Sequence, residues 1–157
     1  MNKPVVIIGS GFSGSSTAFH LASLGIKTLV LERNDSLGGY FPTLEMQFPT
    51  NSCGVCFMNP DYPSFCPYIE LQRDENIECV TGANIIQIKQ MDSDYKVIYE
   101  NKDGVFEISA QAVVLSTGYD TFDVKDKPEL GGGIYNEVLP ALEMEKLIYR
   151  LRAGERV

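Results

Sequence analysis

The chain has 157 residues, 44% of them hydrophobic and 22% charged, which is the composition of an ordinary globular domain with a hydrophobic core. Its formal net charge of −8 argues against nucleic acid as a partner, because contacts with phosphates need clustered Lys and Arg. The longest apolar runs have the length of strands and the first residues do not form a signal-peptide pattern, so we expect no membrane span and a cytoplasmic location.

The first forty residues predict a strand, a glycine turn, a helix and a second strand. Residues 5–8 are a continuous β-branched run, which is typical of a strand covered on both faces. They are followed by G-x-G-x-x-G at residues 9–14 and by a helical pattern that stops at Gly25. A second apolar run, residues 28–31, ends at Glu32. This arrangement is the βαβ unit of dinucleotide-binding domains.

Each glycine of the motif has a physical role in such a unit. Gly9 allows the tight turn, Gly11 lets the backbone approach a pyrophosphate, and Gly14 lets the helix pack closely on the strand. The helix N-terminus attracts the anion through its N–H groups and its dipole. Phe12 and Ser13, which begin the helix, therefore belong to the expected cofactor site.

Glu32 ends the second strand about twenty residues after the glycine turn, where a carboxylate accepts hydrogen bonds from ribose hydroxyls. A carboxylate at this position would repel a 2′-phosphate. The sequence therefore argues against NADP.

A second glycine pair, Gly38-Gly39, follows within LERNDSLGGY. An NAD domain has no need of it, whereas the ribityl chain and ring system of FAD continue beyond the pyrophosphate and use a second close backbone approach. The pattern E-x-x-x-x-x-G-G is similar to that of flavoproteins with two dinucleotide-binding domains, the class of glutathione and thioredoxin reductases. It predicts FAD, with Arg33 beside the adenosine and Tyr40 in the flavin site.

The rest of the chain predicts mostly short strands. We expect a buried strand over 77–80, an alternating strand from Ile85, a hairpin, another buried strand over 113–115 that runs into Thr117-Gly118, and a final helix over roughly 139–151. The hairpin joins residues 95–99 to residues 105–109 through a turn at 102–104. The apolar stripe of the final helix is interpreted as core.

These elements predict an α/β fold, a Rossmann-like FAD-binding parallel sheet with an antiparallel β-meander. We expect the FAD-binding domain with its meander at residues 1–124 and a C-terminal extension with a helix at 125–157. A second dinucleotide-binding half is absent from the sequence.

The segment from Gly38 to Pro60 has no helical or strand period, and long aperiodic loops in compact domains are usually functional. Together, FPTNSCGVCFMNP and VLSTGYDTFDVKDKPELGGGIYNEVLPALEMEKLI resemble the A subunit of heterodisulfide reductase and its relatives. The resemblance runs from Val5 to about Leu151. It implies an FAD protein that exchanges electrons with ferredoxin-like or other iron–sulfur partners and with a disulfide-reducing subunit.

The resemblance also implies positions around the cofactor. The loop after the second glycine pair would pass over the isoalloxazine, with Thr50 and Asn51 in the flavin site. Ala83, followed by Asn84, would lie near the adenine. Thr117 and Gly118 would lie near the pyrophosphate or the ribityl chain.

Three roles remain open for the cysteines of the loop. Cys53 and Cys56 form a C-x-x-C that fits a catalytic dithiol exchanging electrons with the flavin, or, together with Cys66, part of an iron–sulfur site. They also fit as small apolar residues packed against the ring. Their spacing matches neither a ferredoxin nor a zinc pattern. Cys79 lies in a strand pattern and is expected to be structural.

The sequence therefore supports an FAD-dependent electron-transfer oxidoreductase subunit of the heterodisulfide reductase type, incomplete alone. The alternative is a non-catalytic flavin-holding assembly module or a fragment of a larger flavoprotein. We expect the partners to be other heterodisulfide reductase-like subunits and ferredoxin-like carriers. A second polypeptide, or a second copy of this one, would cover the exposed face of the flavin.

Overall fold

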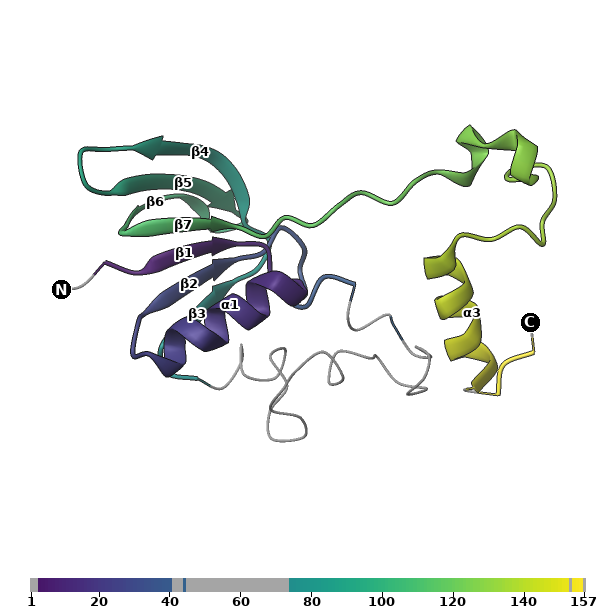
Figure 1. The fold of residues 1–157 in the computed structure, drawn as a ribbon, viewed down its shortest axis with the longest axis horizontal. Coiled ribbons are helices and arrows are strands. Elements are labelled where there is room, and N and C mark those ends of the chain that lie inside the picture. Colours follow the sequence, from purple (N-terminus) through teal and green to yellow (C-terminus); the bar gives the residue numbers. More distant parts are fainter. Residues whose placement is uncertain (1–2, 41–43, 45–73, 153, 157) are drawn as a thin grey trace. The chain divides into compact units, whose positions relative to one another are not determined.

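The computed structural model describes residues 3–40, 44, 74–152 and 154–156 (Figure 1). The chain divides into two compact units. Among the described residues, the first unit contains 3–39 and 74–118, and the second contains Tyr40, Leu44 and the residues from Tyr119 onward.

A parallel sheet forms the centre of the first unit (Figure 1). Its four strands have the order β3-β2-β1-β7, and all neighbouring strands are parallel. The strands are β1 (Val5–Ile8), β2 (Thr28–Leu31), β3 (Ile77–Val80) and β7 (Ala112–Leu115). The predicted α/β class with a Rossmann-like parallel sheet is confirmed.

The central strand β1 is buried on both faces, which explains its unbroken β-branched sequence. Val5 and Ile7 pack in a core cluster with Ala18 of helix α1 (Phe12–Ser23). Val6 and Ile8 belong to a second cluster on the other face of the sheet. Because neighbouring side chains of a strand point to opposite faces, four consecutive apolar residues serve both clusters.

The second cluster joins the parallel sheet to an antiparallel sheet of order β4-β5-β6. Val97, Tyr99 and Ala110 are its buried residues from this sheet. The hairpin turn is at residues 102–103, where Asp103 N donates to Asn101 Oδ1 at 2.8 Å. The strands are β4 (Asn84–Gln90), β5 (Tyr95–Asn101) and β6 (Gly104–Ala110), so the predicted meander is confirmed.

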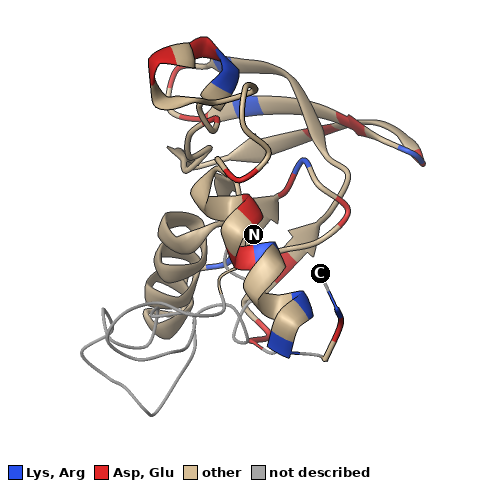
Figure 2. Cartoon of the chain, turned by 90° about the vertical axis from the view of Figure 1, so that its right-hand side faces the viewer, with Lys and Arg blue, Asp and Glu red and all other residues tan. Residues whose placement is uncertain are grey.

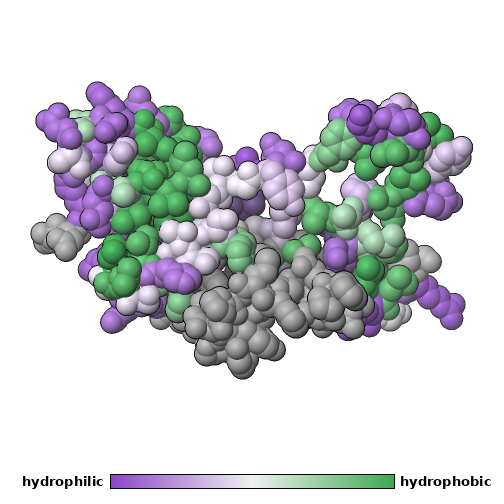
Figure 3. All heavy atoms as spheres, viewed as in Figure 1, coloured by the Kyte–Doolittle hydropathy of each residue, from purple (hydrophilic) through white to green (hydrophobic). Residues whose placement is uncertain are grey.

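The antiparallel sheet also carries apolar side chains outside its core. Ile86 and Val105 are 52% and 65% exposed, and apolar residues appear on the corresponding part of the surface in Figure 3. The pattern of β4 is interrupted by a register shift between Ile85 and Gln87, which is the mark of a β-bulge.

Two strands are less buried than the sequence predicts. The continuous apolar run at 113–115 predicts burial, yet Leu115 is 68% exposed and the rest of β7 is half-buried. In β3, Glu78 is exposed and its neighbours are half-buried. Both are edge strands of the described sheet, so each has a neighbour on one side only.

The second unit contains the short 3-10 helices η3 (Val124–Asp126) and η4 (Pro128–Leu130), and helix α3 (Ala141–Arg152). None of the described residues of α3 is buried, so the stripe interpreted as core is only half-buried or exposed. Acidic residues are spread over the described chain (Figure 2). No described helix is long and apolar enough to cross a membrane.

Candidate functional site

The segments that follow the four parallel strands form one edge of the first unit. Residues 9–14 follow β1, 32–39 follow β2, 81–83 follow β3, and 116–118 follow β7. The chain moves from β1 outward to β2 and β3 and then returns to the other side of β1 with β7. Ligands of such sheets bind where the strand order reverses, which is at the glycine turn after β1.

Gly9 and Gly14 are required by close backbone packing. Gly9 has a φ of +98°, and a Cβ there would lie 2.3 Å from the carbonyl oxygen of Ser116. A Cβ on Gly14 would lie 1.9 Å from the carbonyl oxygen of Gly9. The turn is thus held between α1 and the end of β7, as the roles assigned to these two glycines require.

Gly11 is different, because a Cβ at this position would meet none of the described residues within 4 Å. Gly11 is also the residue before α1, and no described side chain caps the first N–H groups of the helix. Within the described part of the chain, the turn therefore has open space beside the positive end of a helix. This is the arrangement that a pyrophosphate group needs.

Glu32 is buried at 5% exposure and is held by three hydrogen bonds. Ser10 donates to Oε2 from both its backbone N, at 2.9 Å, and its hydroxyl, at 2.6 Å. The backbone N of Asn34 donates to Oε1 at 2.9 Å. The carboxylate is thus fixed at the base of the glycine turn.

The second glycine pair lies against the first. Gly38 and Gly39 have φ values of +102° and +58°, which glycine adopts readily. A Cβ on Gly39 would be 3.1 Å from Gly11 Cα, and Gly38 N donates to the Ser10 hydroxyl oxygen at 2.9 Å. The two motifs that the sequence separates form one continuous backbone surface.

The other predicted cofactor residues of the first unit are placed as follows. Ala83 is buried in the core and donates from its backbone N to the Glu32 carbonyl oxygen at 2.8 Å. Thr117 and Gly118 are exposed and follow β7, whose continuation brings Ser116 against Gly9. Phe12 and Ser13 begin α1, and Arg33 is an exposed residue next to Glu32.

Tyr40, also predicted for the flavin site, belongs to the second unit. Its ring centroid lies 5.8 Å from that of Tyr119. The residues that directly follow Gly39 and Gly118 are therefore in contact with each other.

Five predicted residues lie outside the described part of the chain: Thr50, Asn51, Cys53, Cys56 and Cys66. Their assignments stay predictions. Cys79 is a half-buried cysteine of β3. Burial, followed by the neighbouring Glu78 carboxylate, raises the pKa of this thiol from 9.0 to about 11. At neutral pH it is therefore protonated, as expected of a structural cysteine.

Sequence reasoning missed two residues of the site. Ser10 contributes through long-range hydrogen bonds with Glu32 and Gly38. Ser116 contributes through the close approach of its backbone to Gly9. Ser10 occupies a variable position of G-x-G-x-x-G, so the motif gives no signal for it. The one hint in the sequence is a hydroxyl residue placed between two glycines of a turn.

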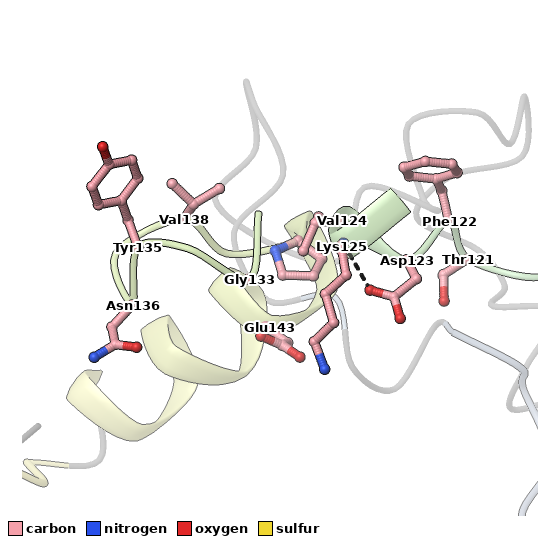
Figure 4. A pocket seen from close by; sticks show the side chains of 11 residues that line it. Thr121, Phe122, Asp123, Val124, Lys125, Gly133, Tyr135, Asn136, Val138 and Glu143 are labelled. Atoms are coloured by element: carbon pink, nitrogen blue, oxygen red, sulfur yellow. Dashed lines mark hydrogen bonds between the residues drawn. The ribbon is translucent and has the colours of Figure 1, made fainter. Parts of the chain in front are cut away.

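The second unit has a pocket of about 510 Å³ (Figure 4). Its lining carries both charged and aromatic side chains, and the Asp123 carboxylate in it accepts a hydrogen bond from Lys125 N at 3.0 Å. The predicted site residues that the structure describes do not line this pocket.

Several known proteins are similar to this chain in sequence. The profile of the NAD(P)-binding Rossmann-like domain family matches residues 7–65. The chain is 22% identical to an iron–sulfur A subunit of the CoB–CoM heterodisulfide reductase of Methanopyrus kandleri, over 91% of this chain and 32% of the relative. It is also 22% identical to the A subunit of the H2:CoB–CoM heterodisulfide,ferredoxin reductase of Methanothermobacter thermautotrophicus. That match covers 94% of this chain and 33% of the relative.

The chain is similar to the FAD-binding domain of the A subunit of heterodisulfide reductase. A protein of Archaeoglobus profundus that is itself like this A subunit is 30% identical over 65% of this chain and 14% of its own length. The chain spans about a third of the length of the Methanopyrus and Methanothermobacter proteins.

Solved structures support the same fold. L-proline dehydrogenase from P. horikoshii matches with a TM-score of 0.63 and 21% identity, over 98% of this chain and 34% of its own. Bacillithiol disulfide reductase from Bacillus cereus matches with a TM-score of 0.56 and 18% identity, over 76% of this chain and 40% of its own. The chain therefore shares its fold with these two structures.

Proposed function

We propose that the chain binds FAD at the glycine turn and serves as the flavin-binding part of an oxidoreductase of the heterodisulfide reductase type. The observation that carries this proposal is the union of the two glycine motifs, since Gly38 and Gly39 lie against Ser10 and Gly11. A site for a shorter dinucleotide would need only the first motif. Similarity to the A subunit of heterodisulfide reductase supports the same cofactor.

The residues of the chain fit FAD in distinct ways. The open space at Gly11 and the uncapped start of α1 suit the pyrophosphate. The Glu32 carboxylate suits the ribose hydroxyls of the adenosine and disfavours a 2′-phosphate. When bound, FAD would supply the electron-transfer chemistry.

We further propose that electrons pass between ferredoxin-like or other iron–sulfur partners and a disulfide-reducing partner. The support is the names of the relatives, which are heterodisulfide reductase subunits and in one case part of a heterodisulfide,ferredoxin reductase. Since the chain spans about a third of those relatives, we propose that further polypeptide segments complete the flavin site and the electron path.

The cofactor is tested by denaturing the purified protein and identifying the nucleotide it releases. FAD is the expected result, and release of NAD or FMN alone would contradict the proposal. Redox function is tested separately by following the absorbance of bound flavin while a reduced ferredoxin or a dithiol is added. Bleaching of the flavin supports electron transfer, whereas an unreactive bound flavin would favour a holding module.

A further inference from the structure

Ser10 connects three parts of the site through one buried side chain. It is 0% exposed, and its hydroxyl donates to Glu32 Oε2 at 2.6 Å while accepting from Gly38 N at 2.9 Å. Its backbone N donates to the same carboxylate oxygen at 2.9 Å. Its carbonyl oxygen accepts a hydrogen bond from the Ser15 hydroxyl at 2.7 Å, which ties the residue to α1.

We propose that Ser10 is a positioning residue that sets which oxygen of Glu32 is available to the ribose and keeps the second glycine pair against the first. This inference rests on the proposed FAD site. It adds that selectivity for a ribose 2′-hydroxyl depends on a side chain that does not itself reach the ligand.

The number of hydrogen bonds that the Glu32 carboxylate accepts explains how Ser10 sets which oxygen is available. A carboxylate has about four acceptor positions, two on each oxygen. Two donors from Ser10 fill Oε2, and Asn34 N takes one position on Oε1. Among the described residues, nothing fills the other position on Oε1, so that oxygen is the one left for a ribose hydroxyl. Without the Ser10 hydroxyl, Oε2 regains a free acceptor position, and two backbone donors hold the carboxylate in place of three donors.

The same hydroxyl keeps the second glycine pair in place. Its oxygen accepts from Gly38 N, and that N–H lies in a buried residue, where an unpaired donor is costly. Replacing the Ser10 side chain therefore weakens the hold on the Glu32 carboxylate and leaves the Gly38 N–H without this acceptor. A change in one residue should alter both the adenosine and the flavin ends of the site.

The test compares ADP with 2′-deoxy-ADP as displacers of bound FAD, for the wild-type chain and for Ser10→Ala. The wild type should prefer ADP about tenfold, as expected for one charge-assisted hydrogen bond. In Ser10→Ala this ratio should fall towards one, and FAD itself should bind about tenfold more weakly. Thr17→Ala is the matched control, because the Thr17 hydroxyl donates to the Ser13 carbonyl oxygen in the same helix without contacting Glu32.

The outcomes separate this inference from the proposed function. A wild-type chain that binds no FAD would overturn the proposed function. Suppose that the wild type binds FAD and that Ser10→Ala binds ADP and 2′-deoxy-ADP more weakly but with an unchanged ratio of affinities. That result would overturn only the positioning role of Ser10. If circular dichroism shows that Ser10→Ala does not fold, Ser10→Cys keeps a side chain of similar size with a weaker donor. It should give an intermediate ratio, and a wild-type ratio in that variant would contradict the inference.

Discussion

The three glycines of the first turn look alike in the sequence but meet different surroundings. A Cβ would collide with backbone at Gly9 and Gly14, whereas at Gly11 it would meet none of the described residues within 4 Å. Gly9 and Gly14 are therefore needed for packing, and Gly11 is the glycine that we propose faces the ligand. Substitutions by alanine can separate the two roles.

We expect Gly11→Ala to leave the free energy of unfolding within about 0.5 kcal/mol of wild type while lowering FAD affinity at least about tenfold, because the new methyl group fills the ligand's space. Gly14→Ala should instead destabilise the fold by about 1–3 kcal/mol or more, since its Cβ would lie 1.9 Å from a backbone oxygen. Urea unfolding and flavin-fluorescence titration measure the two quantities. Full FAD binding by Gly11→Ala would contradict the assignment of the site.

For Glu32, we expect replacement by Ala to weaken FAD binding by about 1–3 kcal/mol, the usual cost of losing a charge-assisted hydrogen bond. The same change leaves the backbone N–H groups of Ser10 and Asn34 without their acceptor, so stability should also fall. Glu32→Gln, which keeps the size and an acceptor oxygen, is the control for the effect on the fold. FAD titration combined with thermal unfolding separates binding from stability.

Cys79 gives a prediction on pH. The pKa of the Cys79 thiol is about 11 in the folded chain, whereas its ordinary value is 9.0. Between pH 9 and pH 11 the folded state therefore keeps a thiol proton that the unfolded state has lost. Stability should therefore decrease as pH rises from about 9 to about 11. Burial also raises the pKa of Tyr99, so Cys79→Ala should remove only part of this slope.

Alkylation at neutral pH should be slow at Cys79, and faster labelling of Cys53 or Cys56 would support a redox dithiol.

At the scale of elements, regular sequence patterns predicted the sheet well. The continuous apolar runs at 5–8 and 28–31 matched β1 and β2 to the residue, because strands covered on both faces have no competing pattern. The predicted burial of β7 was too high, since the same kind of run also suits an edge strand. Whether a strand lies at the edge or in the centre of a sheet depends on the topology of the whole domain, and the local pattern of apolar residues does not predict it.

The short helix η3 of the second unit depends on Gly132, a glycine to which the sequence analysis assigns no role. In the second unit, a Cβ on Gly132 would lie 2.0 Å from the carbonyl oxygen of Val124 in η3. Gly132→Ala should destabilise this unit by about 1–3 kcal/mol. Gly154→Ala is the control and should cost less, because a Cβ there meets none of the described residues within 4 Å, although the φ of Gly154 is +83°. Protease resistance of the second unit would report the difference, and equal resistance of the two variants would contradict the packing role.

At the scale of the whole molecule, the site could be predicted where it consists of motifs and not where it consists of distant contacts. Gly9, Gly11, Gly14 and Glu32 follow from spacing alone, and the structure assembles them with Gly38 and Gly39. The hydroxyl of Ser10 was missed because its partners lie 22 and 28 residues away in sequence. No spacing rule relates a serine to a glutamate at that distance.

The contact between Gly9 and Ser116 has a consequence for how the protein is made. Ribosomes synthesise the βαβ unit before the meander, and β7 leaves the ribosome only after the whole meander. Until then β1 has an unpaired edge, which is a site for wrong pairing with other chains. A nascent chain arrested before Ala112 should therefore fail to retain FAD and should aggregate, whereas one arrested with β7 outside the ribosome should not. Cofactor capture would then wait for the synthesis of β7, although the glycine turn and Glu32 are translated well before it.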